Sequence, residues 1–283
     1  GLFTALVTAL IAMFAFIWSY FAIPKTIEIG QYYYELLFWG GGHIIQFTHT
    51  QLMLVLWFWL ATISGIKLFI TTRTAIILLA LGMAPTLLTP LIYFAYNINS
   101  PDSLNAFTDL MKYGGGLAAL PLGLIITISI IKSDKKLLTL TPEYSALIIS
   151  IFFFAVGGII GFMIHGSNVT IPAHYHASIF AITIVFMGIT YYLLPKLGFR
   201  KITSKWAKWQ PIIYGTGQLM HVLGLAWSGG YGVQRKTAGA EQGLEGMQQV
   251  AMGIMGLGGM IAIIGGIIFL VLVLKSLRRS SHS

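Results

Sequence analysis

The sequence of 283 residues contains no cysteine and few charged residues. Without cysteine the chain has no disulfide, no thiolate metal site and no covalent haem attachment through a C-x-x-C-H motif. Only 9% of its residues are charged and 57% are hydrophobic, whereas a soluble domain has about 25% charged residues. The composition therefore indicates a polytopic membrane protein. Rossmann, P-loop and zinc motifs are also absent, and nothing supports nucleic-acid binding despite the net charge of +9.

Eight apolar runs are each long enough to cross a bilayer, which takes about 20 residues. We predict one all-α membrane domain over 1–283, a helical bundle with spans at 2–23, 35–65, 74–97, 107–131, 144–165, 172–194, 210–229 and 246–274. The first run lacks a basic segment and a small-residue cleavage site, so we predict a true span and not a signal peptide. The chain begins with Gly1, which indicates either processing or a missing N-terminal segment.

The basic residues fall mainly on one side of this predicted bundle. That side carries Lys67, Arg73, Lys132, Lys135, Lys136, Lys196, Arg200, Lys201, Lys205, Lys208, Lys275, Arg278 and Arg279. The other side carries Lys25, Lys112, Arg235 and Lys236. Because cytoplasmic loops carry an excess of Lys and Arg, we predict that both termini are cytoplasmic, in a prokaryotic inner membrane.

The sixth run, IPAHYHASIFAITIVFMGITYYLLPK, has His174 and His176 near its outer end. Residues two apart on a helix point about 200° from each other, so these imidazoles cannot easily share one metal but can serve two sites. Polar rings inside a membrane need partners, and haem iron is one candidate. The alternative is a pair of hydrogen-bonded histidines near the interface.

Three glycines, Gly40, Gly41 and Gly42, precede His43 in the second run. Glycine in a helix costs about 1 kcal/mol relative to alanine, which suggests that something flat or bulky lies close to the backbone there. The alternative is that the glycines permit tight helix packing while His43 bonds a neighbouring carbonyl. For His49, six residues on, we expect local polar partners among Gln46, Thr48, Thr50 and Gln51.

The seventh run places Gln218 and His221 inside the membrane and leads into a loop with Arg235 and Lys236 on the outer side. Cations there oppose the usual charge bias and need anions, such as haem propionates. Contact with lipid headgroups is the alternative.

Several of these segments together resemble subunit I of the haem-copper oxidase superfamily, which includes cytochrome c oxidase and the nitric oxide reductase large subunit. AHYHASIFAITIVFMGITYYLLPKLG resembles its tenth helix, LMHVLGLAWSGGYGVQRK the end of its eleventh, and FWGGGHIIQF its sixth. The resemblance covers helices five to twelve. It implies that His174 binds a high-spin haem, that His176 binds a low-spin haem, and that Arg235 and Lys236 hold propionates. It also matches His43 to a copper ligand and His165 to an outer-loop histidine.

The sequence departs from this family in four respects. Helices one to four, with the second axial ligand of the low-spin haem, are not matched. The adjacent histidine pair of the copper site is absent near Leu91 to Tyr93, and copper there needs three nitrogen ligands. Phe47 stands where many oxygen-reducing members have tyrosine, and the lysine of a proton path is replaced by an apolar residue near Leu124. We therefore expect no working copper site.

We predict a haem-binding membrane subunit, with one or two haems of b type near the outer face, that carries electrons within a respiratory complex. His174 is the expected iron ligand, His43 a second axial ligand or distal group, and His176 the ligand of a possible second haem. The expected partners are other subunits of the complex and an exported cytochrome or quinone. One alternative is part of a catalytic oxidase or nitric oxide reductase whose missing ligands lie on another segment or chain. The other is a cofactor-free scaffold.

Overall fold

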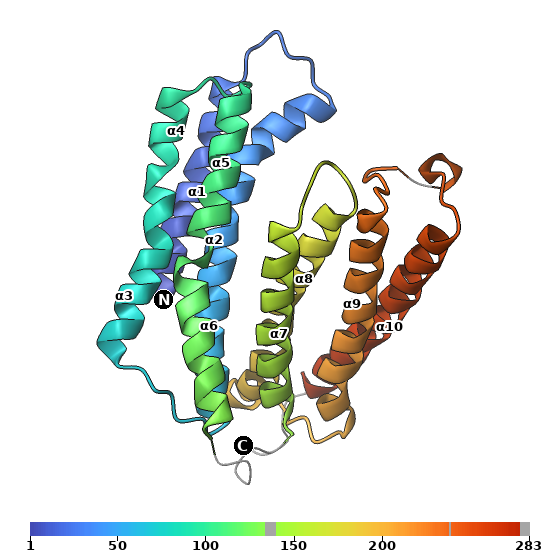
Figure 1. The fold of residues 1–283 in the computed structure, drawn as a ribbon. Helices are drawn as coiled ribbons and strands as arrows, with labels where there is room; N and C mark the ends of the chain where they lie inside the picture. The colour runs from blue at the N-terminus through green and yellow to red at the C-terminus, as the bar shows by residue number, and fades with distance from the viewer. Residues whose placement is uncertain (134–139, 238, 278–283) are drawn as a thin grey trace. The chain divides into compact units, whose positions relative to one another are not determined.

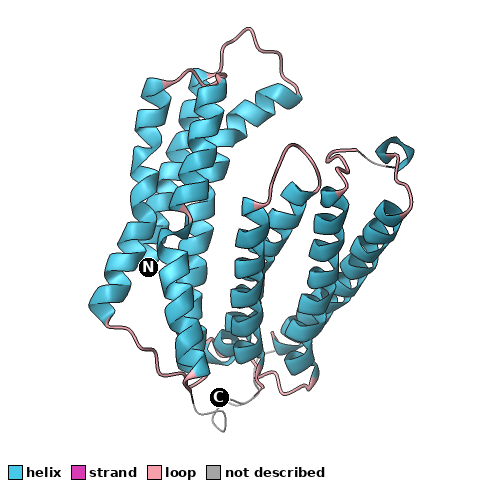
Figure 2. Ribbon diagram, in the orientation of Figure 1, coloured by secondary structure: helices cyan, strands magenta, loops and turns pink. Residues whose placement is uncertain are grey.

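A computed structural model describes residues 1–133, 140–237 and 239–277. Four of the basic residues used to predict the orientation lie outside these ranges, namely Lys135, Lys136, Arg278 and Arg279. Helices joined by loops make up the described chain, and these ranges contain no β-strand (Figure 2). The prediction of an all-α membrane bundle is confirmed in its fold class.

Most helices lie over the predicted spans, but the span predicted at 107–131 begins at Pro101 and is interrupted at Gly115. Figure 1 shows the order of the helices along the chain. In chain order they are α1 (Leu2–Ala22), α2 (Gln31–Ile63), α3 (Thr72–Met83), the 3₁₀-helix η1 (Ala84–Leu88), α4 (Thr89–Ala95), α5 (Pro101–Gly114), α6 (Gly116–Ile131), α7 (Pro142–Phe162), α8 (Thr170–Lys196), α9 (Trp206–Gly230), the 3₁₀-helix η2 (Gly239–Gln242) and α10 (Met247–Ser276).

Seven stretches in the described ranges are long and apolar enough to cross a membrane. They are Leu2–Ala22, Gln31–Ile63, Thr72–Ala95, Pro101–Ile131, Pro142–Phe162, Thr170–Lys196 and Met247–Ser276. The remaining predicted span, 210–229, lies in α9, a helix of 25 residues that is not among the seven. Gln210, Gln218 and His221 make α9 less apolar than its neighbours. Gln210 accepts from Tyr191 and donates to the Gly265 oxygen, and His221 donates to the Met255 oxygen.

Several helices begin at side-chain caps that the sequence supplies. The hydroxyls of Thr71, Ser100 and Thr141 each accept a hydrogen bond from the backbone N–H three residues on, at 3.1, 3.2 and 3.2 Å. Proline occupies the first helical turn of α5 and of α7, where its missing N–H costs nothing. These caps fix the helix starts independently of membrane packing.

Proline also interrupts the predicted third span. Pro85 cannot donate the backbone hydrogen bond that an α-helix requires, so α3 ends at Met83 and the chain continues as η1. Pro90 lies in the first turn of α4, where an unpaired backbone N–H is normal. The run from Thr72 to Ala95 is therefore one span built of three helical segments.

The chain divides into two compact units. Unit 1 comprises residues 1–58 and 67–132, with α1, most of α2, and α3 to α6. Its core includes one cluster of Ala12, Ile44, Ile92 and Phe107, and another of Ile23, Leu36 and Ile98. Inside unit 1, buried polar pairs join α1 to α2: the Thr8 and Thr48 hydroxyls lie 2.9 Å apart, and Thr4 donates to Gln51 at 3.0 Å.

Unit 2 comprises residues 59–66 and 133–283, with α7 to α10. Within it, α7 packs against α8, α8 against α9, and α9 most extensively against α10 (Figure 1). Small residues allow this closeness: a Cβ on Gly224 would lie 2.6 Å from the Ala251 oxygen and the Met255 nitrogen of α10. The α8–α9–α10 contacts place the histidines of α8 and α9 in a rigid frame.

Candidate functional site

Helix α8 directs His174 and His176 toward two different neighbours within unit 2. Nδ1 of His174 lies 2.7 Å from the backbone oxygen of Gly157 on α7. The ring of His176 contacts the ring of His221 on α9, with centroids 4.7 Å apart and planes at 72°. The two histidines thus serve separate sides of one helix, as their spacing predicts.

The hydrogen bond to Gly157 fixes the protonation pattern of His174. A backbone carbonyl can only accept, so Nδ1 carries the hydrogen and Nε2 keeps its lone pair. Metal-binding histidines characteristically donate their other ring N–H to a carbonyl or carboxylate in this way. The half-buried ring of His174 is therefore held with a ligating nitrogen available.

Glycines on α7 make room for this ring. A Cβ on Gly161 would lie 2.8 Å from Nδ1 and 2.9 Å from Cε1 of His174. A Cβ on Gly157 would lie 3.0 Å from the Ser178 backbone nitrogen on α8. The two helices are in close contact at these small residues, and Gly161 borders the imidazole directly. The tautomer of His174 and its hydrogen bond to the Gly157 oxygen both suit a ligand of haem iron.

His221 is also anchored through Nδ1, which donates to the Met255 oxygen of α10 at 3.0 Å. A Cβ on Gly259 would lie 3.4 Å from that same nitrogen, so a glycine again borders an imidazole. His221 therefore presents Nε2 as an acceptor or ligand beside His176. The sequence placed His221 inside the membrane but gave it no role, because its neighbour depends on how α8 and α9 pack.

His43 lies on α2 in unit 1 and has the same protonation pattern. Its Nδ1 donates to the Trp39 oxygen one turn earlier at 2.7 Å, and its ring lies 4.9 Å from the Trp39 ring. This bond to a neighbouring carbonyl agrees with the alternative interpretation of His43 given above. The same bond leaves Nε2 free, so it is compatible with a ligand role as well.

The glycines before His43 are explained in part by aromatic packing within unit 1. A Cβ on Gly40 would collide with the Tyr93 hydroxyl and lie 2.9 Å from Phe107, and one on Gly41 would collide with Phe16. A Cβ on Gly42 would meet nothing within 4 Å. The flat groups close to Gly40 and Gly41 are therefore side chains of this chain.

His49 lacks the local partners that the sequence suggested. Thr48 and Gln51 bond toward α1 and α3, while Gln46 and Thr50 bond back to carbonyls of their own helix. His49 is exposed, and its ring makes no hydrogen bond within the described residues. The expectation of a local partner was wrong, because each candidate side chain already bonds to another group.

The loops before α8 and after α9 pair with each other in unit 2. The Val169 N–H donates to the Val233 oxygen at 2.9 Å, and an isolated antiparallel bridge joins Asn168 to Gln234. Arg235 donates through Nε to the Ser167 hydroxyl at 3.1 Å.

This pairing brings the basic loop beside the loop that carries His165. Exposed His165 accepts a hydrogen bond from Asn168 through its backbone oxygen, and Lys236 has a positive φ of 64°. Arg235 and Lys236 thus lie where the loop after α9 pairs with the loop before α8.

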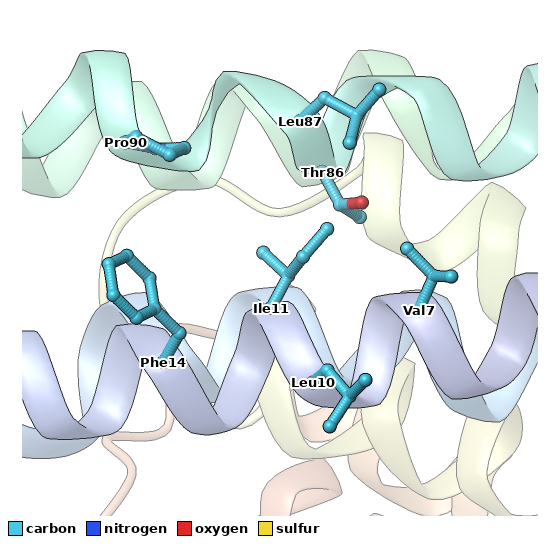
Figure 3. Close-up of a pocket in the computed structure, with 7 residues that line it drawn as sticks. All are labelled: Val7, Leu10, Ile11, Phe14, Thr86, Leu87 and Pro90. Atoms are coloured by element: carbon cyan, nitrogen blue, oxygen red, sulfur yellow. The ribbon is translucent and has the colours of Figure 1, made fainter.

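A hollow of about 280 Å³ lies between α1 and the η1–α4 segment of unit 1 (Figure 3). Its lining residues are Val7, Leu10, Ile11, Phe14, Thr86, Leu87 and Pro90. Ile11 points toward Thr86 in this view, whereas Leu10 points away from the opposite segment. Thr86, the one polar member, donates to the Met83 oxygen at 2.8 Å. The hollow therefore offers no group for catalysis or ligation, and the candidate chemistry resides with the histidines.

The chain matches known sequences over most of its length. It is 30% identical to the uncharacterized protein RP382 of Rickettsia prowazekii (strain Madrid E), over 97% of this chain and 62% of that protein. It is 27% identical to an uncharacterized protein of Aquifex aeolicus (strain VF5), over 74% of this chain and 50% of that protein. The chain thus spans between half and two thirds of the length of these relatives. Residues 1–276 match the family described as cytochrome c and quinol oxidase polypeptide I. The chain belongs to this family, that of haem-copper oxidase subunit I.

Proposed function

We propose that this chain is a haem-binding subunit that carries electrons within a respiratory redox complex. The family normally works in membrane respiratory complexes and generally binds haem and copper. His174 is the iron ligand in this proposal, and its Nδ1–H bond to the Gly157 oxygen is the observation that carries it. That bond aims a lone-pair nitrogen away from α7 and fixes the ring orientation, which is how proteins hold a ligating histidine.

A bound haem would supply one-electron chemistry, and the protein residues would position it and set its surroundings. Gly161 leaves the space in which the His174 ring sits. Apolar side chains around α8 keep the region dry, which strengthens electrostatic interactions. Arg235, with Lys236, pairs with propionates in this proposal, and His165 lies on the neighbouring loop. The absence of cysteine excludes covalent attachment of the c type, and the haem in this proposal is of b type.

His43 is proposed as a second axial ligand or as a distal group. The support is chemical: its Nδ1 is engaged by a carbonyl, and its Nε2 is available. Two imidazole ligands make a low-spin electron carrier, whereas one leaves a coordination position for a small ligand. The His43→Ala variant separates these, since an unchanged low-spin spectrum would rule out His43 as an axial ligand.

The proposed orientation places both termini in the cytoplasm and the His174 site near the outer face of a prokaryotic inner membrane. Its support is the excess of Lys and Arg on one side of the spans. Electron exchange with an exported cytochrome or with quinone follows from a site on that side.

A second candidate is a segment of a catalytic oxidase or nitric oxide reductase. The observation that favours it is length, because the chain spans 62% and 50% of the two relatives. The ligands missing from the copper site would then be contributed by other segments or chains. Metal analysis distinguishes the electron carrier from the catalytic oxidase or reductase. Copper or non-haem iron present in proportion to haem supports the catalytic function.

The test is a pyridine haemochrome measurement on purified protein, with the haem count per chain as the readout. The electron-carrier proposal expects at least one haem, reduced in one-electron steps, and loss of it in His174→Ala. His49→Ala is the matched control, because His49 is exposed and has no role in the proposed site, so the count should stay unchanged. A count of zero in the unaltered protein overturns the proposal in favour of the cofactor-free scaffold.

A further inference from the structure

The loop between α8 and α9 is fixed against the end of α10 within unit 2. The Arg200 N–H donates to the Ser276 oxygen at 3.1 Å, and the Ser276 hydroxyl donates back to the Arg200 oxygen. Ile202, from the same loop, packs against a buried cluster to which α8, α9 and α10 each contribute a residue. The end of α8, the start of α9 and the end of α10 therefore make one surface at the same end of unit 2 (Figure 1).

Positive charge is concentrated on this surface. Its exposed cations are Lys196, Arg200, Lys201, Lys205, Lys208 and Lys275. Among the described acids of unit 2, Glu143 lies at this end, at the start of α7, whereas Glu241 and Glu245 lie between α9 and α10 at the other end. None of the six cations makes an ion pair within the described residues. A surface with one sign of charge and so little internal compensation attracts anions.

Two tryptophans lie beside this charge in the first turns of α9. Trp206 and Trp209 are 50% and 52% exposed, and residues three apart share a helix face. Neither indole N–H makes a hydrogen bond within the part of the chain that the structure describes. Tryptophan is enriched at the headgroup level of membranes, where the ring meets acyl chains and the N–H meets polar groups. The cations and the indoles thus fit the same depth of a bilayer.

The last turns of α10 extend this surface with apolar side chains. Leu270 and Leu274 are exposed and lie four residues apart, so they share one face of the helix that leads to Lys275. An acyl chain can lie along such side chains while a phosphate contacts the cations, since lysine stems extend over apolar surface to reach a charged partner. A soluble acidic peptide would meet the same cations but would leave the leucines and the indoles without an apolar partner.

We propose that this surface binds the phosphate headgroups of anionic phospholipids. Clusters of Lys and Arg at the ends of membrane helices attract such headgroups, and arginine adds directed hydrogen bonds to phosphate oxygens. The bound phosphates offset the repulsion between the six cations and connect the ends of α8, α9 and α10. The proposal is independent of haem, because it uses no histidine.

The experiment is native mass spectrometry of the purified full chain, titrated in detergent with phosphatidylglycerol or with phosphatidylcholine of the same acyl chains. We expect the unaltered protein to bind phosphatidylglycerol at least tenfold more tightly than phosphatidylcholine. The test variant is K201Q/K205Q/K208Q, which removes three exposed charges and no side-chain hydrogen bond. We expect it to lose at least tenfold in affinity for phosphatidylglycerol and to keep its affinity for phosphatidylcholine, which also shows that it is folded.

The matched control is K67Q/R73Q/K132Q, which removes three cations from unit 1 on the same predicted side of the membrane. No tryptophan is adjacent to these positions in sequence, so we expect affinity for phosphatidylglycerol to change less than twofold. Equal affinity of the unaltered protein for the two lipids, or equal losses in the two triple variants, would overturn the proposal. Displacement of phosphatidylglycerol by a soluble Glu-rich peptide at equal concentration would also overturn it, and would identify an acidic protein segment as the occupant.

Discussion

The Gly161→Ala substitution tests whether α7 holds His174 in its ligating orientation. The new methyl group would lie 2.8 Å from Nδ1 and 2.9 Å from Cε1 of His174, closer than a carbon atom can approach. The ring must therefore shift, and the Nδ1 bond to the Gly157 oxygen at 2.7 Å is strained or lost. Overpacking typically costs about 1 to 3 kcal/mol, and loss of a hydrogen bond about 1 kcal/mol.

The matched control is Gly158→Ala, since both glycines lie in α7 and a Cβ on Gly158 would meet nothing within 4 Å. Both substitutions share the helix-propensity gain of about 1 kcal/mol for alanine over glycine. We expect Gly161→Ala to unfold with a free energy about 2 to 4 kcal/mol below that of Gly158→Ala, measured by denaturant titration in detergent. Haem content should fall in Gly161→Ala alone. Equal stability and equal haem content in the two variants would refute the reasoning.

Two further substitutions probe helix packing, one in each unit. Gly258→Ala would drive a methyl group to 2.6 Å from the Gly217 oxygen and against the His221 backbone nitrogen, so it should cost about 3 kcal/mol. Gly256→Ala is its control, since nothing lies within 4 Å there; similar melting temperatures for the two would contradict the α9–α10 packing. In unit 1, Tyr93→Phe removes the hydroxyl that donates to the Ala15 oxygen at 3.0 Å and lies 2.8 Å from the Ser19 hydroxyl. A loss of about 1 kcal/mol in unfolding free energy is expected, and no change would show that these bonds add nothing.

Apolar run length was enough to predict where most of the helices lie. It did not predict the helix starts after the Ser100 and Thr141 caps or the interruptions at Pro85 and Gly115, which depend on local backbone hydrogen bonding. The two-residue spacing of His174 and His176 predicted two sides of α8 without any knowledge of the neighbours. In the structure, His174 contacts Gly157 on one side of α8 and His176 contacts His221 on the other.

What the sequence could not predict depends on packing between helices. The pairing of His176 with His221 requires the register of α8 against α9, which no periodicity within either helix determines. Gly40 and Gly41 looked like space for a bound group, but Phe16, Tyr93 and Phe107 fill it from elsewhere in unit 1. The prediction of a local hydrogen-bond partner for His49 was also wrong, because its polar neighbours bond to other groups.

The central claim is that His174 binds a haem iron through Nε2, and ligand rescue tests it most directly. The His174→Gly variant leaves a space beside Gly157 and Gly161 that free imidazole can enter. We expect the variant, purified with haem supplied, to lack the native absorption spectrum and to regain it when imidazole is added. An unaltered haem spectrum in His174→Gly before imidazole is added would show that His174 is not the iron ligand.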